Sequence, residues 1–550
     1  MFRQILFVVT ALLVGAPVAA QDKTDRIDKI FSWATPATPG CAVAVSQHGK
    51  LAVNRAYGLA DLERDVPLSP GTVFDVGSLR KQFVAASILL LVEEGRLALS
   101  DDVRKLIPEL PDYGNKITLD HMLTHTSGLR DWVGLLNLAD GDVEAWTMIL
   151  RQRGLNFAPG EEWSYSNSGY VLLTEIVART SGMSFAEFAR QRLFEPLGMK
   201  ATTYVNDMQD VIKNRALPYE KAGNGWKQDM LLGNDRGGGG ALFSTASDLL
   251  IWNEALTSAK LGAFVSEKLQ EPAKLNNGRA LSTAGRGLFM ETHRGAKEIW
   301  YTGSAAAYKA FLGRFPEHGL SISILCNAGD STNRTLYAQR IFDLFVPAAP
   351  AAAPESEAPP ANTGDALVDV NGKAGLFFNE RSGEPLRLAV DRGRFRVAGG
   401  PGLVPVAKDR YRRLGAFVQF MSQDEFELHF LSPDQFELKS MEGRTARYRR
   451  AEAYTPTAAD LKTFAGRYES DELKAIFQMV PGKDGLMIRA NDSPGEGVEF
   501  KPVTRDVFQR GMITMRFLRD KAEKIVALDF SNPVLRNIKF TRLSDRTSRQ

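Results

Sequence analysis

Several residue types and motifs that mark common functional classes are scarce or missing in this chain of 550 residues. Histidine occurs only six times, and no His-Glu-x-x-His motif is present, so a zinc hydrolase is not indicated. No Gly-x-Ser-x-Gly sequence occurs, which argues against an α/β-hydrolase. The formal net charge is only +3, and a chain with so small a surplus is not expected to bind nucleic acid.

Long apolar runs are missing as well. The run at residues 5–14 is too short for a transmembrane helix, which needs about 20 apolar residues. Arg3 precedes this run, and the small residues Val18-Ala19-Ala20 follow it, a pattern typical of a secretory signal. We therefore expect residues 1–20 to be a signal peptide. The mature protein, starting near Gln21, is expected to be periplasmic or secreted and to carry no membrane anchor.

The length and the local composition predict several domains. A stretch rich in proline and alanine at residues 347–364 has little to bury and is predicted to be a linker. Residues 21–346, before it, mix strand and helix patterns. Short alternating segments after it predict two small antiparallel β-barrels, at 365–452 and 454–544. The predicted fold class is α+β.

Within the first domain, apolar alternation predicts strands at 41–46, 51–57 and 320–326. Helical spacing is found at 78–94 and 168–180. The only two cysteines, Cys41 and Cys326, fall in two of the predicted strands. Two buried thiols are the commoner state for such residues, and a disulfide stays open because export leads to an oxidising compartment.

Ser78 and Lys81 form the only Ser-x-x-Lys pair in the chain, at the start of a predicted helix. The i, i+3 spacing places both side chains on one helix face, with the serine at the positive end of the helix dipole. A nearby cation and backbone N–H groups are what an activated serine nucleophile needs. The alternative is an N-capping serine beside a solvated lysine, and for an isolated pair this alternative is the commoner one.

A Tyr-x-Asn sequence occurs three times, beginning at Tyr113, Tyr165 and Tyr204. Tyr113 belongs to a turn, and Tyr204 precedes a polar loop. Tyr165 and Asn167 lie between a Pro-Gly turn and an apolar helix, so that a scaffold holds their polar groups. Context therefore favours the middle pair.

These motifs, in this order, resemble those of the serine β-lactamase, DD-peptidase and D-aminopeptidase family. Two further segments of the chain are similar to sequence motifs that recur in that family: Leu-Thr-His-Thr-Ser-Gly-Leu at 123–129 and Gly-Gly-Gly-Ala-Leu-Phe-Ser-Thr at 238–245. The resemblance covers about residues 21–346 and implies a β-lactamase-like domain in which an antiparallel sheet packs with helices. The two C-terminal blocks, with Phe-Ala-Gly-Arg-Tyr at 464–468, resemble the paired barrels of D-aminopeptidase-type members.

The third motif of the family, usually a lysine or histidine followed by Thr-Gly or x-Gly, reads Tyr301-Thr302-Gly303 and is followed by Ser304. A tyrosine thus stands where the family has a cation or an imidazole. The resemblance implies that the backbone N–H groups of Ser78 and Ser304 form the oxyanion hole. This role needs main chain only, so it tolerates Tyr301.

The resemblance also implies roles for the other residues: Ser78 attacks, Lys81 and Tyr165 manage its proton, and Asn167 orients the substrate. For Tyr165 to act as a base near neutral pH, its pKa must fall by about three units from about 10. One cation about 4 Å away supplies about 4 kcal/mol, so Lys81 alone just suffices. An alkaline optimum is expected unless another cation helps, the candidates being Arg294, Lys297 and Lys309.

Two further pairs of residues are weaker candidates for functional sites. His121 and His125 lie four apart on a predicted helix, and a structural pair is more frequent than a metal site in such a case. Asp492 and Glu496 lie in a predicted loop of the last barrel, where they are candidates for recognising a substrate amine, the alternative being a solvated hairpin tip.

The sequence as a whole predicts an exported serine hydrolase that cleaves an amide or ester through an acyl-enzyme, without metal or cofactor. Within the resembling family, a D-aminopeptidase or DD-peptidase-like activity is the first expectation, and a small molecule or a peptide is the expected substrate. A carboxylesterase or a weak β-lactamase is the alternative on the same fold. An alternative of another class is a non-catalytic penicillin-binding or sensor-like protein.

Overall fold

The computed structural model describes residues 16–544, with several internal gaps. The gaps are 137, 141–142, 208–209, 230–239, 330–331, 347–369, 371, 381–384, 392–393, 399–401, 414–425, 441–444, 452–453, 491–496, 512 and 533. The first 15 residues of the predicted signal peptide and the whole predicted linker therefore lie outside the described residues.

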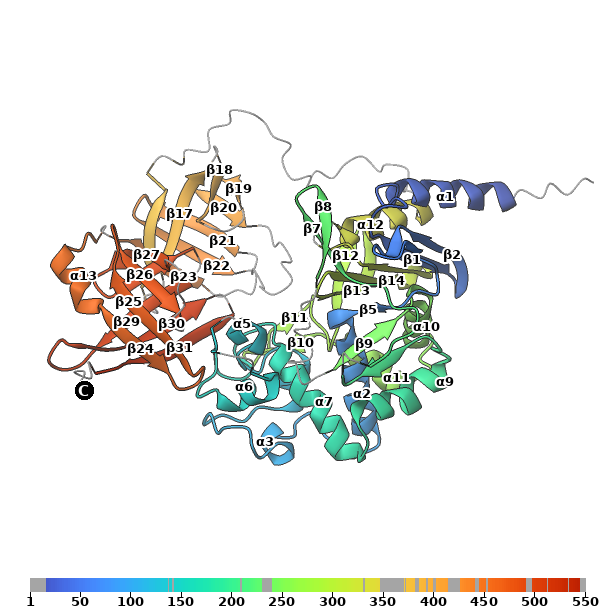
Figure 1. Ribbon diagram of the computed structural model, residues 1–550, viewed down its shortest axis with the longest axis horizontal. Coiled ribbons are helices and arrows are strands. Elements are labelled where there is room, and N and C mark those ends of the chain that lie inside the picture. The colour runs from blue at the N-terminus through green and yellow to red at the C-terminus, as the bar shows by residue number, and fades with distance from the viewer. Residues whose placement is uncertain are drawn as a thin grey trace, which may run out of the picture.

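A six-stranded antiparallel sheet forms the centre of the first domain (Figure 1). All seven residues of its strand β15 are buried, so both faces of the sheet are covered at this point. The three strands predicted from apolar alternation are confirmed as β1, β2 and β15. In spatial order the strands are β12 (Phe289–His293), β13 (Ala296–Ala305), β14 (Tyr308–Phe315), β15 (Leu320–Cys326), β1 (Cys41–Gln47) and β2 (Lys50–Tyr57).

Helices cover the two faces of this sheet. Asn253 of α10 (Ala246–Thr257) bonds to Arg314 of β14 on one face. Phe342 of α12 (Arg334–Phe345) packs on Phe315, the next residue of the same strand, and therefore lies on the other face. Helix α1 (Ala16–Ile30) packs against α12.

A mainly helical part of the domain is built around α2, which is buried along nearly its whole length and packs against α7. Three short strands pair beside it in the order β5-β9-β6. The helices are α2 (Arg80–Glu93), α3 (Val103–Leu106), α4 (Leu119–Leu123), α5 (Trp132–Leu136), α6 (Ala145–Arg151), α7 (Asn167–Ser181), α8 (Phe185–Ala189), η2 (Arg190–Phe194), α9 (Glu195–Leu197) and α11 (Ala263–Gln270), with the turn η4 (Pro316–His318). The short strands are β3 (Leu59–Asp61), β4 (Val66–Pro67), β5 (Phe74–Asp75), β6 (Thr203–Val205), β7 (Tyr219–Ala222), β8 (Gly225–Gln228), β9 (Ala241–Ser244), β10 (Ala273–Lys274) and β11 (Ala280–Leu281).

The first C-terminal block is an eight-stranded antiparallel sheet that curls until its two edge strands touch. A single bridge between Arg396 and Gly402 links the edges, so the barrel is nearly closed. Alternate side chains point inward, and a cluster of aromatic residues around Phe377 and Phe436 forms its core. The strands are β16 (Gly375–Asn379), β17 (Pro385–Asp391), β18 (Arg394–Val397), β19 (Leu403–Ala407), β20 (Arg410–Arg413), β21 (Phe426–Ser432), β22 (Gln435–Ser440) and β23 (Thr445–Arg450).

The second C-terminal block is a closed eight-stranded barrel, which follows helix α13 (Ala458–Phe464). Its first and last strands pair at Tyr468 and Arg542, and this pairing closes the barrel. It lies beside α5 and α6 of the first domain (Figure 1). The predicted architecture, a mixed domain followed by two antiparallel barrels, is confirmed. The strands are β24 (Gly466–Ser470), β25 (Ala475–Pro481), β26 (Leu486–Ala490), β27 (Val498–Thr504), β28 (Val507–Arg510), β29 (Ile513–Arg519), β30 (Ile525–Asn532) and β31 (Leu535–Arg542).

The two cysteines form a disulfide across neighbouring strands. Cys41 of β1 stands directly opposite Cys326 of β15, with their Cα atoms 4.0 Å apart. The expectation of two buried thiols is therefore wrong, because the strand register brings the two side chains together. In the described part of the chain, no helix has the length and apolar character needed to span a membrane.

Candidate active site

Ser78 lies in a 3-10 turn, Gly77–Leu79 (η1), which leads directly into α2. The turn needs glycine at its first position, because Gly77 has a positive φ of 53°. A Cβ atom on Gly77 would also lie 2.7 Å from the backbone nitrogen of Ser304 on β13. The serine is therefore fixed between the N-terminal end of the buried helix and the edge of the large sheet.

Three side chains predicted to share the site with Ser78 are brought together in one hydrogen-bonded chain. The hydroxyl of Tyr165 donates to Ser78 Oγ at 2.8 Å. Lys81 Nζ lies 3.2 Å from Ser78 Oγ and donates to Asn167 Oδ1 at 2.7 Å. Lys81 is 1% exposed, so its amino group is available only to these neighbours. The geometry also selects Tyr165 among the three Tyr-x-Asn sequences.

The Tyr165 loop is held by the segment that follows α4. The main-chain N–H of Ser166 donates to His125 Nδ1 at 3.2 Å, and the N–H of Ser164 donates to the His125 carbonyl oxygen. Ser166 in turn caps α7, which begins at Asn167. His125 was expected on a helix with His121, but α4 ends at Leu123, and His125 adopts a positive φ of 59° that directs its ring to the loop.

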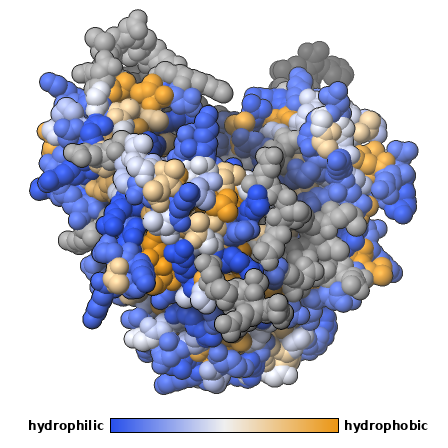
Figure 2. Space-filling view, turned by 60° about the vertical axis from the view of Figure 1, so that its left-hand side comes forward, coloured by the Kyte–Doolittle hydropathy of each residue, from blue (hydrophilic) through white to orange (hydrophobic). Residues whose placement is uncertain are grey.

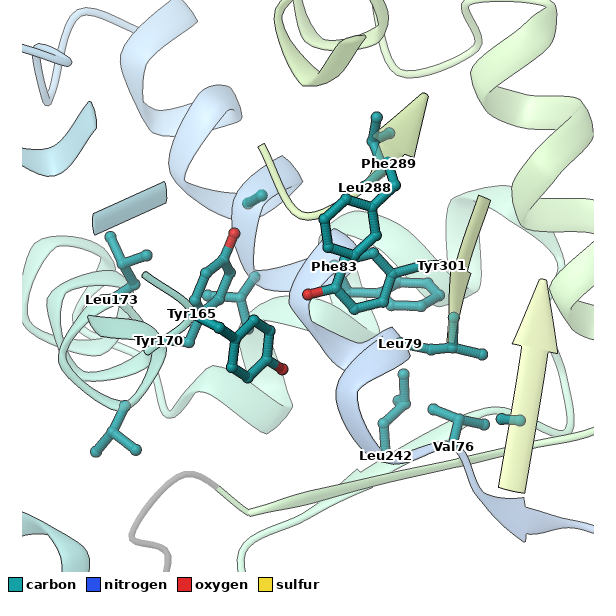
Figure 3. Packing of buried hydrophobic residues seen from close by; sticks show 14 of the residues in the cluster. Val76, Leu79, Phe83, Tyr165, Tyr170, Leu173, Leu242, Leu288, Phe289 and Tyr301 are labelled. Carbon is teal, nitrogen blue, oxygen red and sulfur yellow. The ribbon is translucent and has the colours of Figure 1, made fainter. Parts of the chain in front are cut away.

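The third motif lies on β13, next to η1, as expected for a strand near Trp300. Tyr301 is buried, and its ring stacks on Phe289 at a centroid distance of 4.9 Å. Its hydroxyl points toward the phenol rings of Tyr165 and Tyr170 (Figure 3). Tyr301 therefore continues the aromatic wall of the site, and a cation does not occupy this position.

Gly303 allows β13 to approach the turn that carries Ser78. A Cβ atom at Gly303 would lie 1.8 Å from the carbonyl oxygen of Val76 and 3.2 Å from the backbone nitrogen of Ser78. The backbone of Ser304 is equally close to Gly77. The backbone nitrogens of Ser78 and Ser304 are thus placed at one point of contact between helix and sheet, the arrangement that an oxyanion hole requires.

Burial governs the protonation of the lysine. Loss of hydration, and to a smaller extent the positive charge of Arg80, holds the pKa of Lys81 well below its usual value, while the carboxylate of Asp131 acts in the opposite direction. Burial also lowers the pKa of His125, and the charge of Lys81 adds to this effect. A neutral amine 3.2 Å from a serine hydroxyl is able to accept its proton.

Burial raises the pKa of Tyr165 far above its usual value, and the hydrogen bond with Ser78 only partly opposes this effect. This is the reverse of the shift that a tyrosine base requires. The proposed role of Tyr165 as the base, which came from the family resemblance, therefore finds no support in its surroundings. Its phenol is placed instead to donate a hydrogen bond to Ser78 Oγ.

The three cations considered as helpers for Lys81 lie in different surroundings. Arg294 pairs with Asp343 of α12, and Lys297 is exposed on β13. Lys309 is buried on β14, opposite Ser304. The cation whose charge acts on both Lys81 and Tyr165 is Arg80, which lies between Ser78 and Lys81 in the sequence and donates to the Gly240 carbonyl oxygen.

Asp131 is a residue of the site that the sequence did not indicate. Its Oδ2 accepts hydrogen bonds from both the side-chain and the main-chain nitrogen of Asn167, each at 2.9 Å. Its Oδ1 accepts from the N–H of Val133 at 2.8 Å, and the side chain is 4% exposed. A single aspartate in a loop carries no motif, so only its position two residues after the end of the segment 123–129 hinted at a place near the site.

The remaining candidates lie apart from this chain of bonds. Tyr204 packs against Phe185, and His121 Nδ1 accepts from Thr118 at the start of α4. The two acidic candidates of the last barrel, Asp492 and Glu496, lie outside the described residues.

The arrangement as a whole has the parts of a nucleophilic serine site. A serine at a helix N-terminus is flanked by a buried amine and a phenol, an amide fixes the amine, and the backbones of Ser78 and Ser304 lie close to each other. These parts suit attack on a carbonyl carbon followed by stabilisation of the resulting oxyanion.

Comparison with known proteins agrees with this geometry. The model of the Beta-lactamase family matches residues 28–344. Over 314 residues, the chain is 28% identical to Penicillin-binding protein 4* of Bacillus subtilis, an overlap of 53% of this chain and 68% of that protein. It is 36% identical to the D-aminopeptidase of Gluconobacter oxydans over 169 residues, which are 30% of this chain and 32% of the relative. It is 34% identical to Esterase EstB of Burkholderia gladioli over 202 residues, which are 33% of this chain and 51% of the relative.

Solved structures share the fold at low sequence identity. The octameric penicillin-binding protein homologue from Pyrococcus abyssi superposes with a TM-score of 0.52 at 20% identity, covering 79% of this chain and 100% of that one. D-amino acid amidase from Ochrobactrum anthropi gives 0.51 at 22% identity, covering 59% of this chain and 98% of that one. The family match extends over more than half of the chain and includes Ser78, Lys81, Tyr165 and Asn167. The chain therefore belongs to the Beta-lactamase family.

Proposed function

We propose that this protein is an exported serine hydrolase that cleaves an ester or amide through an acyl-enzyme on Ser78. The observation that carries the proposal is the position of Ser78 Oγ, 2.8 Å from the Tyr165 hydroxyl and 3.2 Å from Lys81 Nζ. The proposed export rests on the signal-like pattern of residues 1–20.

In the proposed first step, neutral Lys81 takes the hydroxyl proton of Ser78 as Oγ forms a bond to the carbonyl carbon. The carbonyl oxygen becomes an oxyanion, which the backbone N–H groups of Ser78 and Ser304 stabilise. The carbon–oxygen or carbon–nitrogen bond of the leaving group then breaks. Tyr165 gives its proton to the leaving group and regains one from the ammonium of Lys81, which leaves Ser78 acylated.

In the second step, water attacks the acyl-enzyme carbonyl carbon and Lys81 accepts a proton from that water. Collapse of the second tetrahedral intermediate breaks the bond to Ser78 Oγ and releases the acid, and the ammonium of Lys81 returns its proton to Ser78 Oγ. Asn167 holds the Lys81 amine throughout by accepting its hydrogen bond. The proton count is the same at the start and at the end of the cycle.

The walls of the site favour an uncharged or apolar acyl group. Tyr301 and Phe289 stack where the family has a cation or an imidazole, and Trp163 lies beside Phe289. An aromatic surface binds apolar groups, and a cation on this side of the site is Arg334, which donates to Ser304 Oγ at 3.4 Å. Esters and amides with an apolar acyl group are therefore the first substrates to test. A D-aminopeptidase activity is the second candidate, favoured by the identity with the Gluconobacter oxydans enzyme.

The test is labelling of the purified protein with a fluorophosphonate, followed by mass spectrometry of the labelled peptide. We expect an adduct on Ser78, no adduct in Ser78→Ala, and unchanged thermal unfolding of that variant. Hydrolysis of p-nitrophenyl butyrate, D-alanine p-nitroanilide and a chromogenic cephalosporin then ranks ester, aminopeptide and β-lactam substrates. A folded protein that forms no adduct and turns over none of them would support the sensor-like alternative and refute the proposal.

A further inference from the structure

Arg130, next to Asp131 in the sequence, joins the first domain to the closed barrel. Its guanidinium forms a 2.5 Å ion pair with Glu472, in the turn after β24, and both side chains are buried. The same guanidinium donates to the carbonyl oxygens of Arg536 and Asn537, at the start of β31, at 2.9 and 3.0 Å. One buried side chain of the first domain thus binds both a turn and the start of a strand of the barrel.

Further contacts extend this junction along the segment that precedes Tyr165. The Asn156 side chain donates to the Val534 carbonyl oxygen and accepts from the N–H of Arg536, both at 2.9 Å. The Arg536 guanidinium makes two bonds to the carboxylate of Glu162, three residues before Tyr165. Glu472 also accepts from the N–H of Arg153 at 2.8 Å. The barrel therefore contacts the segments that immediately precede the site residues.

The main chain between Arg130 and Asp131 leaves little room for independent movement. The Arg130 carbonyl oxygen accepts from Ser168 Oγ at 2.7 Å, and the same oxygen of Ser168 accepts from the N–H of Trp132 at 3.0 Å. Ser168 follows Asn167 at the start of α7. A shift of Arg130 toward or away from the barrel is therefore transmitted to Asp131 and to the first turn of α7.

Asp131 determines which way the Asn167 amide faces. A carboxylate only accepts, so the Nδ2 group of Asn167 must lie toward Asp131 and Oδ1 toward Lys81. The line Glu472–Arg130–Asp131–Asn167–Lys81–Ser78 is then continuous, with the peptide chain as the link between Arg130 and Asp131. All of its hydrogen-bonded contacts are between 2.5 and 3.2 Å.

We propose that Arg130 and Asp131 are positioning residues that make docking of the closed barrel a condition for the catalytic orientation of Asn167 and Lys81. The barrel is thus part of the support of the active site. This inference rests on the proposed function for its catalytic consequence, but the structural coupling stands independently of the substrate. A misplacement of about 1 Å at a reacting group reduces a rate by about 100-fold, so a loosened junction is expected to be visible in the acylation rate.

The experiment uses the full chain and compares Glu472→Ala, Glu472→Gln and Asp131→Asn with the wild type. Two readouts are taken: hydrogen exchange of peptides covering 128–135 and 164–170, and the rate of fluorophosphonate labelling of Ser78. For Glu472→Ala we expect faster exchange in both peptides and labelling slowed by about 10- to 100-fold. Glu472→Gln keeps an acceptor for Arg130 and should show a smaller loss.

Asp131→Asn distinguishes a specific effect of Asp131 on Lys81 from a general loss of structure at the site. Removing the carboxylate removes a charge that raises the pKa of Lys81. The acid limb of the pH profile of the labelling rate should therefore move to lower pH. Glu472→Ala changes geometry and not this charge, and its acid limb should stay in place. A purely structural role for Asp131 would lower the rate without moving the limb.

Asp506→Asn is the matched control, because it weakens an ion pair with Arg519 inside the same barrel. It should leave exchange at 164–170 and labelling at wild-type values. Wild-type exchange at 164–170 in Glu472→Ala would overturn the coupling, and so would altered exchange with unaltered labelling. If the wild type itself forms no adduct, the proposed function fails, and hydrogen exchange alone decides the coupling.

Discussion

Lys81 and Tyr165 both reach Ser78, but burial moves their pKa values in opposite directions. The cationic form of a lysine loses hydration in the interior, so the neutral amine is favoured. The anionic form of a tyrosine loses hydration too, so the neutral phenol is favoured. The same desolvated site therefore makes lysine a better base and tyrosine a worse one. With Lys81 as the base and Tyr165 as a proton donor, no second cation is needed near Tyr165. This assignment explains how Tyr301 is tolerated.

The acid limb of the pH–rate profile should report deprotonation of Lys81. Arg80 lowers the pKa of Lys81, so Arg80→Gln should raise that pKa and move the limb of kcat/KM to higher pH. The measurement is ester hydrolysis between pH 5 and 10, with Lys105→Gln as an exposed control far from the site. A limb that stays in place in Arg80→Gln would refute the electrostatic role of Arg80.

Glu298 offers a separate prediction, on stability. Burial, together with Glu291 directly opposite on β12, raises the pKa of Glu298 to about 7. In the unfolded chain this carboxyl ionises near its usual pKa, so stability is lost as the pH rises from about 4.5 to 7. Glu298→Gln should therefore stabilise the protein at pH 8, by roughly 3 kcal/mol at most, and much less at pH 5. Urea unfolding at the two pH values measures the difference, and an equal effect at both would contradict the assignment.

The site residues that belong to a sequence motif could be predicted, and those outside any motif could not. Ser78, Lys81, Tyr165 and Asn167 stand at fixed spacings on either side of helix starts, so local sequence was enough to select them. Asp131 was not predictable, because its role depends on where the chain folds back onto α7. The direction of the Tyr165 pKa shift depends on burial, which a sequence motif does not contain.

At the scale of elements, the disulfide joins two central strands of the large sheet. It closes a loop between positions separated by 285 residues, which restricts the unfolded chain more than the folded one. Replacing both cysteines, as Cys41→Ala/Cys326→Ala, should cost about 2–5 kcal/mol of stability and leave ester hydrolysis at 25 °C intact. Thermal unfolding and kinetics of the double variant test this, and an unchanged Tm would show that the bond adds nothing.

Strands and helices with a plain periodicity were predicted well, and their ends less so. Helical spacing predicted a helix from Ser78, whereas α2 begins at Arg80 after the 3-10 turn that presents the serine. The difference arises because β13 packs against this turn and fixes a backbone conformation that spacing alone does not reveal. The same holds for His125, which tertiary contacts turn away from the expected helix.

At the scale of the molecule, two barrels were predictable from alternation, but their docking was not. The face that the barrels bring forward is mainly hydrophilic, with hydrophobic residues in small separate patches (Figure 2). Polar and charged contacts, such as Arg130 with Glu472 and Arg536 with Glu162, hold the closed barrel against the first domain. Surface polar residues look alike in a sequence whether they bind water or a neighbouring domain, so these pairs carried no signal.

A steric test of the docking is available at Gly134 in α5. A Cβ atom there would lie 2.9 Å from a methyl group of Val534 in the barrel. Gly134→Leu should push the barrel away, increase the radius of gyration in small-angle scattering and slow ester hydrolysis. Gly71→Leu is the control, because Gly71 lies on an exposed turn where a Cβ atom would meet only Ser69 Oγ, at 3.8 Å. Unchanged scattering in Gly134→Leu would show that the junction accommodates the side chain.

The disulfide has one more consequence for the molecule as a whole. Every residue assigned to the site, from Ser78 to Ser304, lies between Cys41 and Cys326 in the sequence. A protease that cuts the backbone once anywhere between the two cysteines produces two pieces that remain covalently joined. A nicked molecule would migrate as one band without reductant and as two with it, and all site residues would stay tethered to each other. The bond thus protects the site against dispersal by proteolysis.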